Sequence, residues 1–251
     1  MNKDNMIAKQ KVTRIAETDL SRLLDGTPAI SELMDLDDMP GSPAEWLIEF
    51  AGRTCYESYG RPNPATGDTH KYIERTVHDQ HHFSIIEHAS VSYFIEGVSR
   101  SLLAELSRHR HLSFSVRSQR FINEAEAKIV LPPAIRDLDD KHTDTSIFDS
   151  TTRRDILIDA LEGERELAAD TYDAIVDALT RSGLHRKQAR EAARAVLPNM
   201  VEVKMVVTGN LRAWMEMIGK RDADGADAEI RELARTIHDD LNEYASSVFP
   251  K

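Results

Sequence analysis

Apolar positions along the 251-residue chain repeat with two different periods. Spacings of three and four residues predict helices at 42–56, 72–77, 102–106, 152–183, 210–218 and 226–245, and a further helix that ends before Pro198. Alternating apolar residues predict strands at 91–95 and 201–207. The strands do not alternate with helices in a βαβ rhythm, and no Gly-x-Gly-x-x-Gly turn follows them. We therefore expect an α+β fold, a mixed sheet packed with several long helices, and not a Rossmann fold.

Short local signals mark the ends of several predicted helices. Ser42 and Glu45 have the spacing of a capping box around the first-turn proline Pro43. Gly183 is suited to end the long helix, and Asn210 to cap the one that follows the second strand. The polar stretches 61–69 and 137–150 are typical of exposed connections between such elements.

Size and charge limit the possible classes of protein. A chain of 251 residues, 41% hydrophobic, can bury one core, so we expect a single domain over residues 1–251. The formal net charge of -11 argues against coating nucleic acid or anionic membrane, so any anion site must be local. The N-terminal residues contain neither a signal-like apolar run nor a membrane-spanning segment, so we expect a soluble protein.

Cys55 is the single cysteine of the chain. An intramolecular disulfide and a cysteine-rich zinc site are therefore excluded, and a reducing compartment, the cytoplasm, is the expected location. No neighbouring residue in the sequence marks the thiol as a nucleophile.

The densest chemical feature is the basic segment 108–120, Arg-His-Arg-His-Leu-Ser-Phe-Ser-Val-Arg-Ser-Gln-Arg. Guanidinium groups bind phosphate oxygens through paired hydrogen bonds, and serine and imidazole groups can orient the same anion. Composition alone leaves two interpretations open, a local anion site and a solvated basic loop.

The order of residues within this segment distinguishes the two interpretations. Arg-His-Arg-x-x-Ser followed by Ser-x-Arg resembles the signature of the flavin-dependent thymidylate synthases, and the similarity extends to segments 53–55, 82–88 and 210–221. The resemblance implies the fold of that family and FAD as cofactor. It also implies methylation of dUMP to dTMP with methylenetetrahydrofolate as one-carbon donor and NADPH as reductant. Family members are homotetramers with sites assembled between subunits.

The resemblance also assigns roles to individual residues. FAD is expected at Ser84, Glu87, Arg108, His109, Arg110, Asn210, Arg212 and Glu216. The nucleotide dUMP is expected at Glu105, Arg108, Val116, Arg117, Ser118, Gln119, Arg120, Arg194 and Arg221. His82 is expected at the entrance for folate and nicotinamide, and Arg221 is expected to be catalytic by activating the uracil ring.

Two positions depart from the family pattern. Val116 stands where relatives have a polar residue, so any contact with dUMP must come from its backbone. Glu216 replaces an asparagine or histidine of relatives. Cys55 resembles a flavin-site position, and Ser118, which lacks a neighbouring base in the sequence, is assigned to nucleotide binding and not to nucleophilic attack.

Three alternatives have their own sequence support. The histidine-rich segment His78, His81, His82, Glu87 and His88 has spacings that could bind zinc, although we expect no metal there. A nucleotide-sensing or RNA-binding module could use the same arginines for phosphate. A flavin oxidoreductase without methyl transfer could use the same cofactor site.

Overall fold

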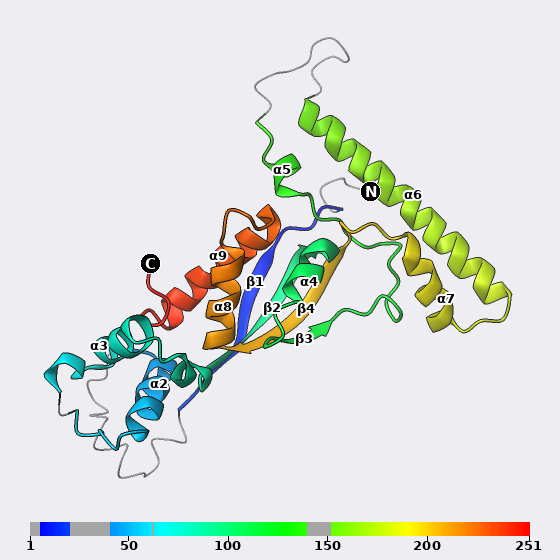
Figure 1. Cartoon of the computed structure of the whole chain (residues 1–251). Helices are drawn as coiled ribbons and strands as arrows, with labels where there is room; N and C mark the ends of the chain where they lie inside the picture. Colours follow the sequence, from blue (N-terminus) through cyan, green and yellow to red (C-terminus); the bar gives the residue numbers. More distant parts are fainter. Residues whose placement is uncertain (1–5, 21–40, 62, 140–151) are drawn as a thin grey trace.

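The structure, a computed structural model, describes residues 6–20, 41–61, 63–139 and 152–251. Its centre is an antiparallel sheet in the order β1-β2-β4-β3 (Figure 1). The strands are β1 (Lys11–Glu17), β2 (Ser90–Ser99), β3 (Ser113–Val116) and β4 (Glu202–Asn210). The predictions of strands at 91–95 and 201–207 are confirmed, and the antiparallel pairing confirms an α+β fold that is not of Rossmann type.

Helices α4 (Arg100–Leu106), α8 (Leu211–Arg221) and α9 (Ala228–Tyr244) pack on one face of this sheet (Figure 1). Buried side chains of β2 alternate with half-buried ones, and the buried set joins the apolar side chains of these helices in one cluster. At its centre, the rings of Tyr93 and Trp214 meet edge to face at 5.2 Å. The apolar side chains whose spacing predicts these strands and helices therefore form one core between the sheet and the helices.

A second group of helices lies at one end of the sheet (Figure 1). It contains α2 (Pro43–Thr54), η2 (Pro64–Thr66), α3 (Thr69–Ile73), η3 (Glu74–Asp79) and η4 (Phe83–Glu87). The capping box of Ser42 and Glu45 is present at the start of α2, as predicted. The helix predicted at 72–77 is wrong in one detail, because the chain passes from α-helical α3 into the π-helical turn η3.

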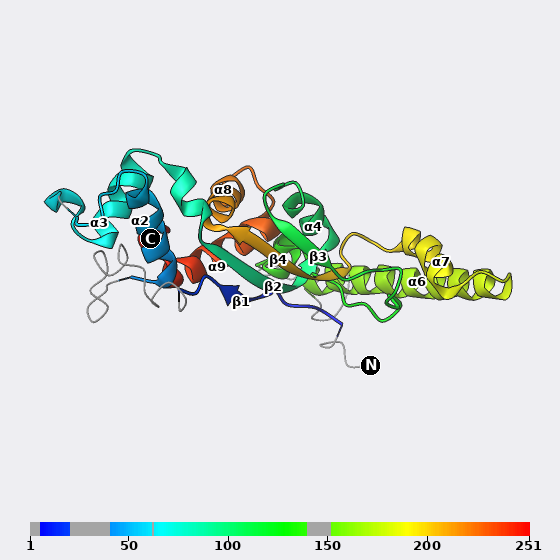
Figure 2. The ribbon, with the colours of Figure 1, turned by 90° about the horizontal axis from the view of Figure 1, so that it is seen from below.

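The long helix α6 (Arg153–Arg181) extends away from the sheet (Figures 1 and 2). Thr152 caps it in a capping box with Asp155, and Gly183 follows it with φ of 90°, as expected for a glycine at a helix end. The remaining helices are α5 (Pro133–Arg136), α7 (Arg186–Ala193) and η5 (Arg194–Val196). In the described parts of the chain, no helix is both long and apolar enough to cross a membrane.

The edge strands β1 and β3 were not predicted from the sequence. Both lie at the edges of the sheet, where a strand pairs with one neighbour only and buries few side chains. Their side chains therefore lack the strong apolar alternation that identifies β2 and β4. The prediction that 137–150 is an exposed connection concerns mostly residues outside the described part of the chain.

Candidate active site

The largest concentration of predicted site residues surrounds a cavity of about 350 Å³, which we call the Arg221 cavity. Its lining comes from two segments that are distant in sequence, the loop after α4 and helix α8. The lining residues are Arg108, His109, Arg110, His111, Leu112, Ala213, Glu216, Lys220 and Arg221.

Local structure explains why the two segments meet. Helix α4 ends at Leu106, and the loop returns the chain to β3, which pairs with β4. At the end of β4, Gly209 leaves room for Leu112, since a Cβ atom at this glycine would lie 2.4 Å from Leu112 Cδ2. Asn210 then caps α8 by accepting a hydrogen bond from the Ala213 amide at 2.8 Å, which confirms its predicted role as a helix cap.

The charges of the Arg221 cavity are unbalanced. Four cationic side chains line it, namely those of Arg108, Arg110, Lys220 and Arg221, and Glu216 is the only acid in the lining. Arg108 and Arg110 make no ion pair with any residue that the structure describes. In a protein with a net charge of -11, unpaired guanidinium groups around a cavity indicate a site for an anion.

Arg221 is held by two other predicted site residues. Its Nε donates to His109 Nε2 at 2.9 Å, and its Nη1 donates to Glu105 Oε2 at 2.7 Å. Its Nη2 donates to the backbone carbonyl of Glu105 at 2.9 Å. A guanidinium has five N–H donors, so these bonds fix its plane and still leave donors for a ligand.

The pKa values of the two partners of Arg221 are shifted. Burial, and then the charge of Arg221, lower the pKa of His109, so the imidazole is neutral and its Nε2 can accept the Arg221 bond. Burial and a hydrogen bond with Asp227 raise the pKa of Glu105, an effect that the Arg221 charge opposes. The neutral imidazole and the paired carboxyl group are both consequences of packing around one guanidinium.

A smaller cavity of about 190 Å³, the Glu87 cavity, adjoins the first. It is lined by Glu87, His111, Asn210, Arg212, Ala213 and Glu216. The two cavities share three lining residues, His111, Ala213 and Glu216, and therefore form one hollow along α8. Arg212 pairs with Glu87, and Lys220 pairs with Glu216. Seven of the residues predicted at the cofactor thus lie around one hollow: Glu87, Arg108, His109, Arg110, Asn210, Arg212 and Glu216.

The other residues predicted at dUMP lie elsewhere in the chain. Val116, Arg117, Ser118, Gln119, Arg120 and Arg194 line neither of these two cavities. Arg117 pairs with Glu124 at 2.7 Å, whereas Arg120 approaches Glu191 of α7 at 3.5 Å. The chain therefore holds two separate groups of predicted nucleotide residues, one at the Arg221 cavity and one between segment 118–120 and α7.

A third cavity, of about 580 Å³, lies among α2, η3 and η4 and contains the predicted residues His82 and Ser84. We call it the Tyr56 cavity. Its lining residues are Gly52, Arg53, Cys55, Tyr56, Ser58, Asn63, Thr66, Tyr72, Arg75, Thr76, Gln80, His82, Ser84 and Ile85. Cys55 is exposed, and its Sγ lies 3.6 Å from the Ala51 carbonyl oxygen.

The histidine-rich segment makes contacts of its own near this cavity. His78 Nε2 lies 2.8 Å from the Ser247 carbonyl oxygen, and the His81 ring stacks on Phe83. Among the described residues, no group of three or more His, Cys, Asp or Glu side chains is placed to hold a metal ion.

Sequence reasoning missed two polar residues of the site, His111 and Lys220. Both line the joined cavities. Lys220 could have been found from its position one residue before Arg221 and one helical turn after Glu216. His111 directly follows the Arg-His-Arg triplet and carried no separate signal.

Comparison with known proteins gives a consistent result. A family model described as "Thymidylate synthase complementing protein" matches residues 36–246. The "Probable flavin-dependent thymidylate synthase" of Mycobacterium phage L5 is 48% identical over 82% of this chain and 79% of the phage protein. The "Flavin-dependent thymidylate synthase" of Mycobacteroides abscessus is 42% identical over 97% of this chain and 90% of its own length.

Two solved structures share the fold at low sequence identity. A UMP/dUMP methylase, PolB, from Streptomyces cacaoi with bound 5-Br UMP has a TM-score of 0.66 and 21% identity, over 98% of this chain and 95% of its own. Thymidylate Synthase X from Helicobacter pylori with FAD and dUMP has a TM-score of 0.59 and 19% identity, over 96% and 98%.

Proposed function

The chain belongs to the family of flavin-dependent thymidylate synthases, and from that premise we propose that the hollow formed by the Arg221 and Glu87 cavities holds FAD and the uracil of dUMP. The enzyme methylates dUMP to dTMP. It takes the one-carbon unit from methylenetetrahydrofolate and its electrons from NADPH. The observation that carries the proposal is the fixed guanidinium of Arg221 in a cationic hollow that the family's triplet, Arg108 to Arg110, lines.

The residues around the hollow fit FAD. Its diphosphate needs cationic donors, and the unpaired guanidinium groups of Arg108 and Arg110 supply them. The N-terminus of α8 adds backbone amides beside Asn210, where negative charge is favoured. We assign His109, Arg212, Glu87, Ser84 and Glu216 to the same cofactor. When bound, FAD supplies the hydride for the reaction.

We assign the activation of uracil to Arg221. Glu105 and His109 hold its guanidinium in one plane, so the remaining N–H donors need no reorganisation when charge develops on a ligand. A cation placed in this way stabilises negative charge on the uracil ring and makes C5 more nucleophilic. The protein therefore contributes orientation and charge and needs no covalent cysteine adduct.

The separation of the two nucleotide groups supports a site made by more than one chain. We propose that the group of Ser118, Gln119, Arg120 and Arg194 binds the phosphate of a dUMP whose base lies in the Arg221 cavity of another subunit. The exposed pair of Arg120 and Glu191 is worth little in water, so a phosphate can displace it at small cost. Val116 is the last residue of β3 and Arg117 follows it, and both would support this group from that strand.

Helix α6 offers the surface for such an assembly. Apolar and small residues recur on it at spacings of three, four and seven, and all are exposed in the single chain: Ile156, Ala160, Gly163, Leu167, Ala174 and Ala178. The Leu167 side chain is 62% exposed, which is costly for a leucine unless another surface covers it. We propose that α6 packs against a second copy in a homotetramer.

Three further assignments are proposals that rest on the family. We propose that the whole chain, residues 1–251, acts as a single domain, that the enzyme works in the cytoplasm, and that His82 lies at the entrance for folate and NADPH. The free thiol of Cys55 is compatible with a reducing compartment.

The purified protein tests the proposal directly. It should be yellow, should bleach under NADPH, and should change its absorption spectrum when dUMP is added. Release of tritium from C5-labelled dUMP, dependent on methylenetetrahydrofolate, separates the synthase from a flavin oxidoreductase. A colourless protein that binds RNA with a steep salt dependence would contradict the proposal.

A further inference from the structure

The residues proposed to bind the phosphate of dUMP lie mostly on one loop, 118–127, which we call the phosphate loop. The backbone amide of Arg117, just before the loop, donates to the Lys204 carbonyl oxygen of β4 at 2.9 Å. Just after the loop, the Lys128 carbonyl oxygen accepts from the Glu202 amide, also on β4, at 2.9 Å. Both ends are therefore fixed to one strand, and the conformation between them depends on other contacts.

A buried ion pair closes the first part of the phosphate loop. Arg117 Nη2 donates to Glu124 Oε2 at 2.7 Å, and the Glu124 side chain is only 1% exposed. Between the two paired residues the chain forms one tight turn, because the amides of Phe121 and Ile122 both donate to the Ser118 carbonyl oxygen. The ion pair therefore joins the two ends of the turn that begins at Ser118.

Helices α6 and α7 hold the outer side of the phosphate loop. Arg190 of α7 donates from Nη1 to the Phe121 carbonyl oxygen, and Arg165 of α6 donates from Nη2 to the Ala125 carbonyl oxygen at 2.7 Å. Helix α7 continues directly into η5, whose first residue is Arg194. The position of the loop relative to Arg194 therefore depends on how the loop sits on these two helices.

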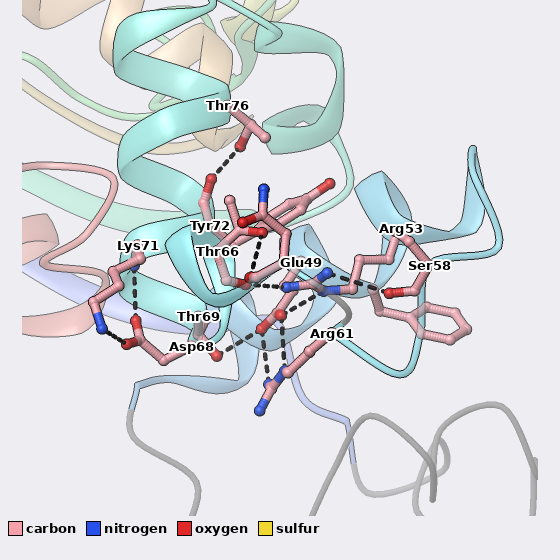
Figure 3. Close-up of polar contacts among 12 residues, drawn as sticks. Glu49, Arg53, Ser58, Arg61, Thr66, Asp68, Thr69, Lys71, Tyr72 and Thr76 are labelled. Atoms are coloured by element: carbon pink, nitrogen blue, oxygen red, sulfur yellow. Dashed lines mark hydrogen bonds and ion pairs between the residues drawn. The ribbon is translucent and has the colours of Figure 1, made fainter.

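A second buried carboxylate paired with arginine, that of Glu49, offers a comparison (Figure 3). Its Oε1 accepts from Arg53 at 2.6 Å, and its Oε2 accepts from Arg61 at 3.0 Å and from the Thr69 hydroxyl at 2.7 Å. Both oxygens of Glu49 are thus used. Glu124 differs, because its Oε1 is buried and has no hydrogen-bond partner among the residues that the structure describes. Its carboxylate therefore has capacity for more than one ion pair.

Two further buried atoms on the neighbouring helices lack a hydrogen-bond partner in the described part of the chain. They are the hydroxyl of Tyr172 on α6 and Nε of Arg190 on α7. Burial raises the pKa of Tyr172, and the Glu124 amide and the Arg190 charge oppose this rise, so the three residues are close enough to interact. Glu124 therefore lies where the phosphate loop meets both helices, in a buried region in which polar groups interact strongly.

We infer that Glu124 is a positioning residue for the nucleotide, which holds the phosphate loop on α6 and α7 so that Ser118 and Arg120 face the phosphate together with Arg194. This inference rests on the proposed function, since it takes the phosphate site from there. The Glu124 side chain is buried, so it acts through the loop and not by contact with dUMP. A loop that is already held in its binding conformation loses less entropy when the ligand binds.

The test compares Glu124→Gln with Glu126→Gln in the flavin-loaded full chain, by steady-state release of tritium from C5-labelled dUMP. Glu126 is exposed on the same loop and makes no ion pair with any described residue. We expect Glu124→Gln to raise the KM for dUMP about tenfold, the order of one hydrogen bond to a charged group. Its kcat should change less than about twofold, because the phosphate is remote from the reacting carbon. Glu126→Gln should change neither constant by more than about twofold.

A second measurement tests whether the effect passes through the phosphate loop. Arg120→Ala removes a proposed phosphate contact, so adding Glu124→Gln to it should raise the KM for dUMP by less than about twofold more. If Glu124→Gln does not fold, Arg117→Met combined with Glu124→Met removes both charges of the pair and leaves none unpaired. That double variant should fold, keep FAD and show the same rise in KM.

Four results would overturn the inference: an unchanged KM in a folded Glu124→Gln, a fall in its kcat as large as the rise in KM, additive effects with Arg120→Ala, and loss of fold or FAD in both the single and the double Glu124 variants. Failure of the proposed function gives different results. Absence of tritium release from the wild type refutes the reaction, and a wild-type KM in Arg120→Ala refutes the phosphate site. A raised KM in Arg120→Ala with an unchanged KM in Glu124→Gln refutes only the role of Glu124.

Discussion

Arg221 and Glu105 are joined twice, through the carboxylate at 2.7 Å and through the backbone carbonyl at 2.9 Å. A residue at the end of α8 is thereby fixed to a residue one turn before the Arg-His-Arg triplet, 116 positions earlier in the chain. A lysine cannot make this planar double contact, because its ammonium group is a point charge without a planar fork of donors.

Arg221→Lys should retain FAD and part of the affinity for dUMP but lose most of its turnover. The guanidinium is expected to meet charge that develops during the reaction, so its loss raises the barrier more than it weakens ground-state binding. Steady-state kinetics of dTMP formation check this, with Arg235→Lys, an exposed residue of α9, as control. Wild-type turnover in a folded, flavin-loaded Arg221→Ala would remove Arg221 from the site.

Arg120→Ala and Arg194→Ala should each weaken dUMP binding by about 1.5 to 3 kcal/mol, the value of a charge-assisted hydrogen bond. FAD binding should change far less, because neither residue lines the cofactor hollow. Equilibrium titrations with dUMP and with FAD measure the two effects, and Arg181→Ala on the exposed end of α6 is the control. Equal losses for both ligands would contradict the assignment to the nucleotide phosphate.

Leu167→Glu should convert the proposed tetramer to smaller species without unfolding the subunit. The side chain is 62% exposed in the single chain, so a charge there costs little in the monomer but is unfavourable inside an interface. Sedimentation velocity gives the oligomeric state and circular dichroism the fold. Thr180→Glu adds the same charge to α6 away from the apolar positions and should stay tetrameric. An unchanged tetramer in Leu167→Glu would exclude this face of α6 from the interface.

Acid should loosen the bond between His109 and Arg221. The pKa of His109 is lowered in the folded protein from its ordinary value of 6.5, so the unfolded chain binds a proton first as the pH falls. This contribution to stability is complete above pH 6.5 and is lost as the pH falls from there to the folded pKa. His109→Gln keeps an acceptor for Arg221 but does not titrate.

Denaturant unfolding of both proteins between neutral and mildly acidic pH measures the effect. The free energy of unfolding of the wild type should fall relative to that of His109→Gln below the ordinary histidine pKa. Parallel curves would mean that His109 is not held neutral by its surroundings.

Cys55→Ser should keep substantial dTMP formation. The thiol is exposed in the Tyr56 cavity and lies outside the Arg221 cavity, where we propose that the uracil binds. Conversion of labelled dUMP by the flavin-loaded variant is the measurement. Complete loss of methylation with FAD still bound would point to a covalent cysteine mechanism.

The sequence by itself determined the central strands, the long helices and their caps, because these elements follow from local periodicity and local hydrogen bonds. Ser42 and Glu45 form their capping box from residues three apart, and β2 and β4 carry strong apolar alternation. It also predicts Arg108 to Arg110 and Arg221 as site residues, since their order along the chain resembles a family signature. Both kinds of information are contained in short stretches of sequence.

Only the tertiary structure decided which of these residues meet. The bonds of Arg221 to His109 and Glu105 depend on the pairing of β3 with β4, and the edge strand β3 has too weak a pattern to be predicted. The Tyr56 cavity was also not predictable from the sequence. It depends on a π-helical turn and a buried ion pair, and local periodicity predicts neither. Contacts between distant segments depend on how the core packs, and packing is a property of the whole chain, not of any segment within it.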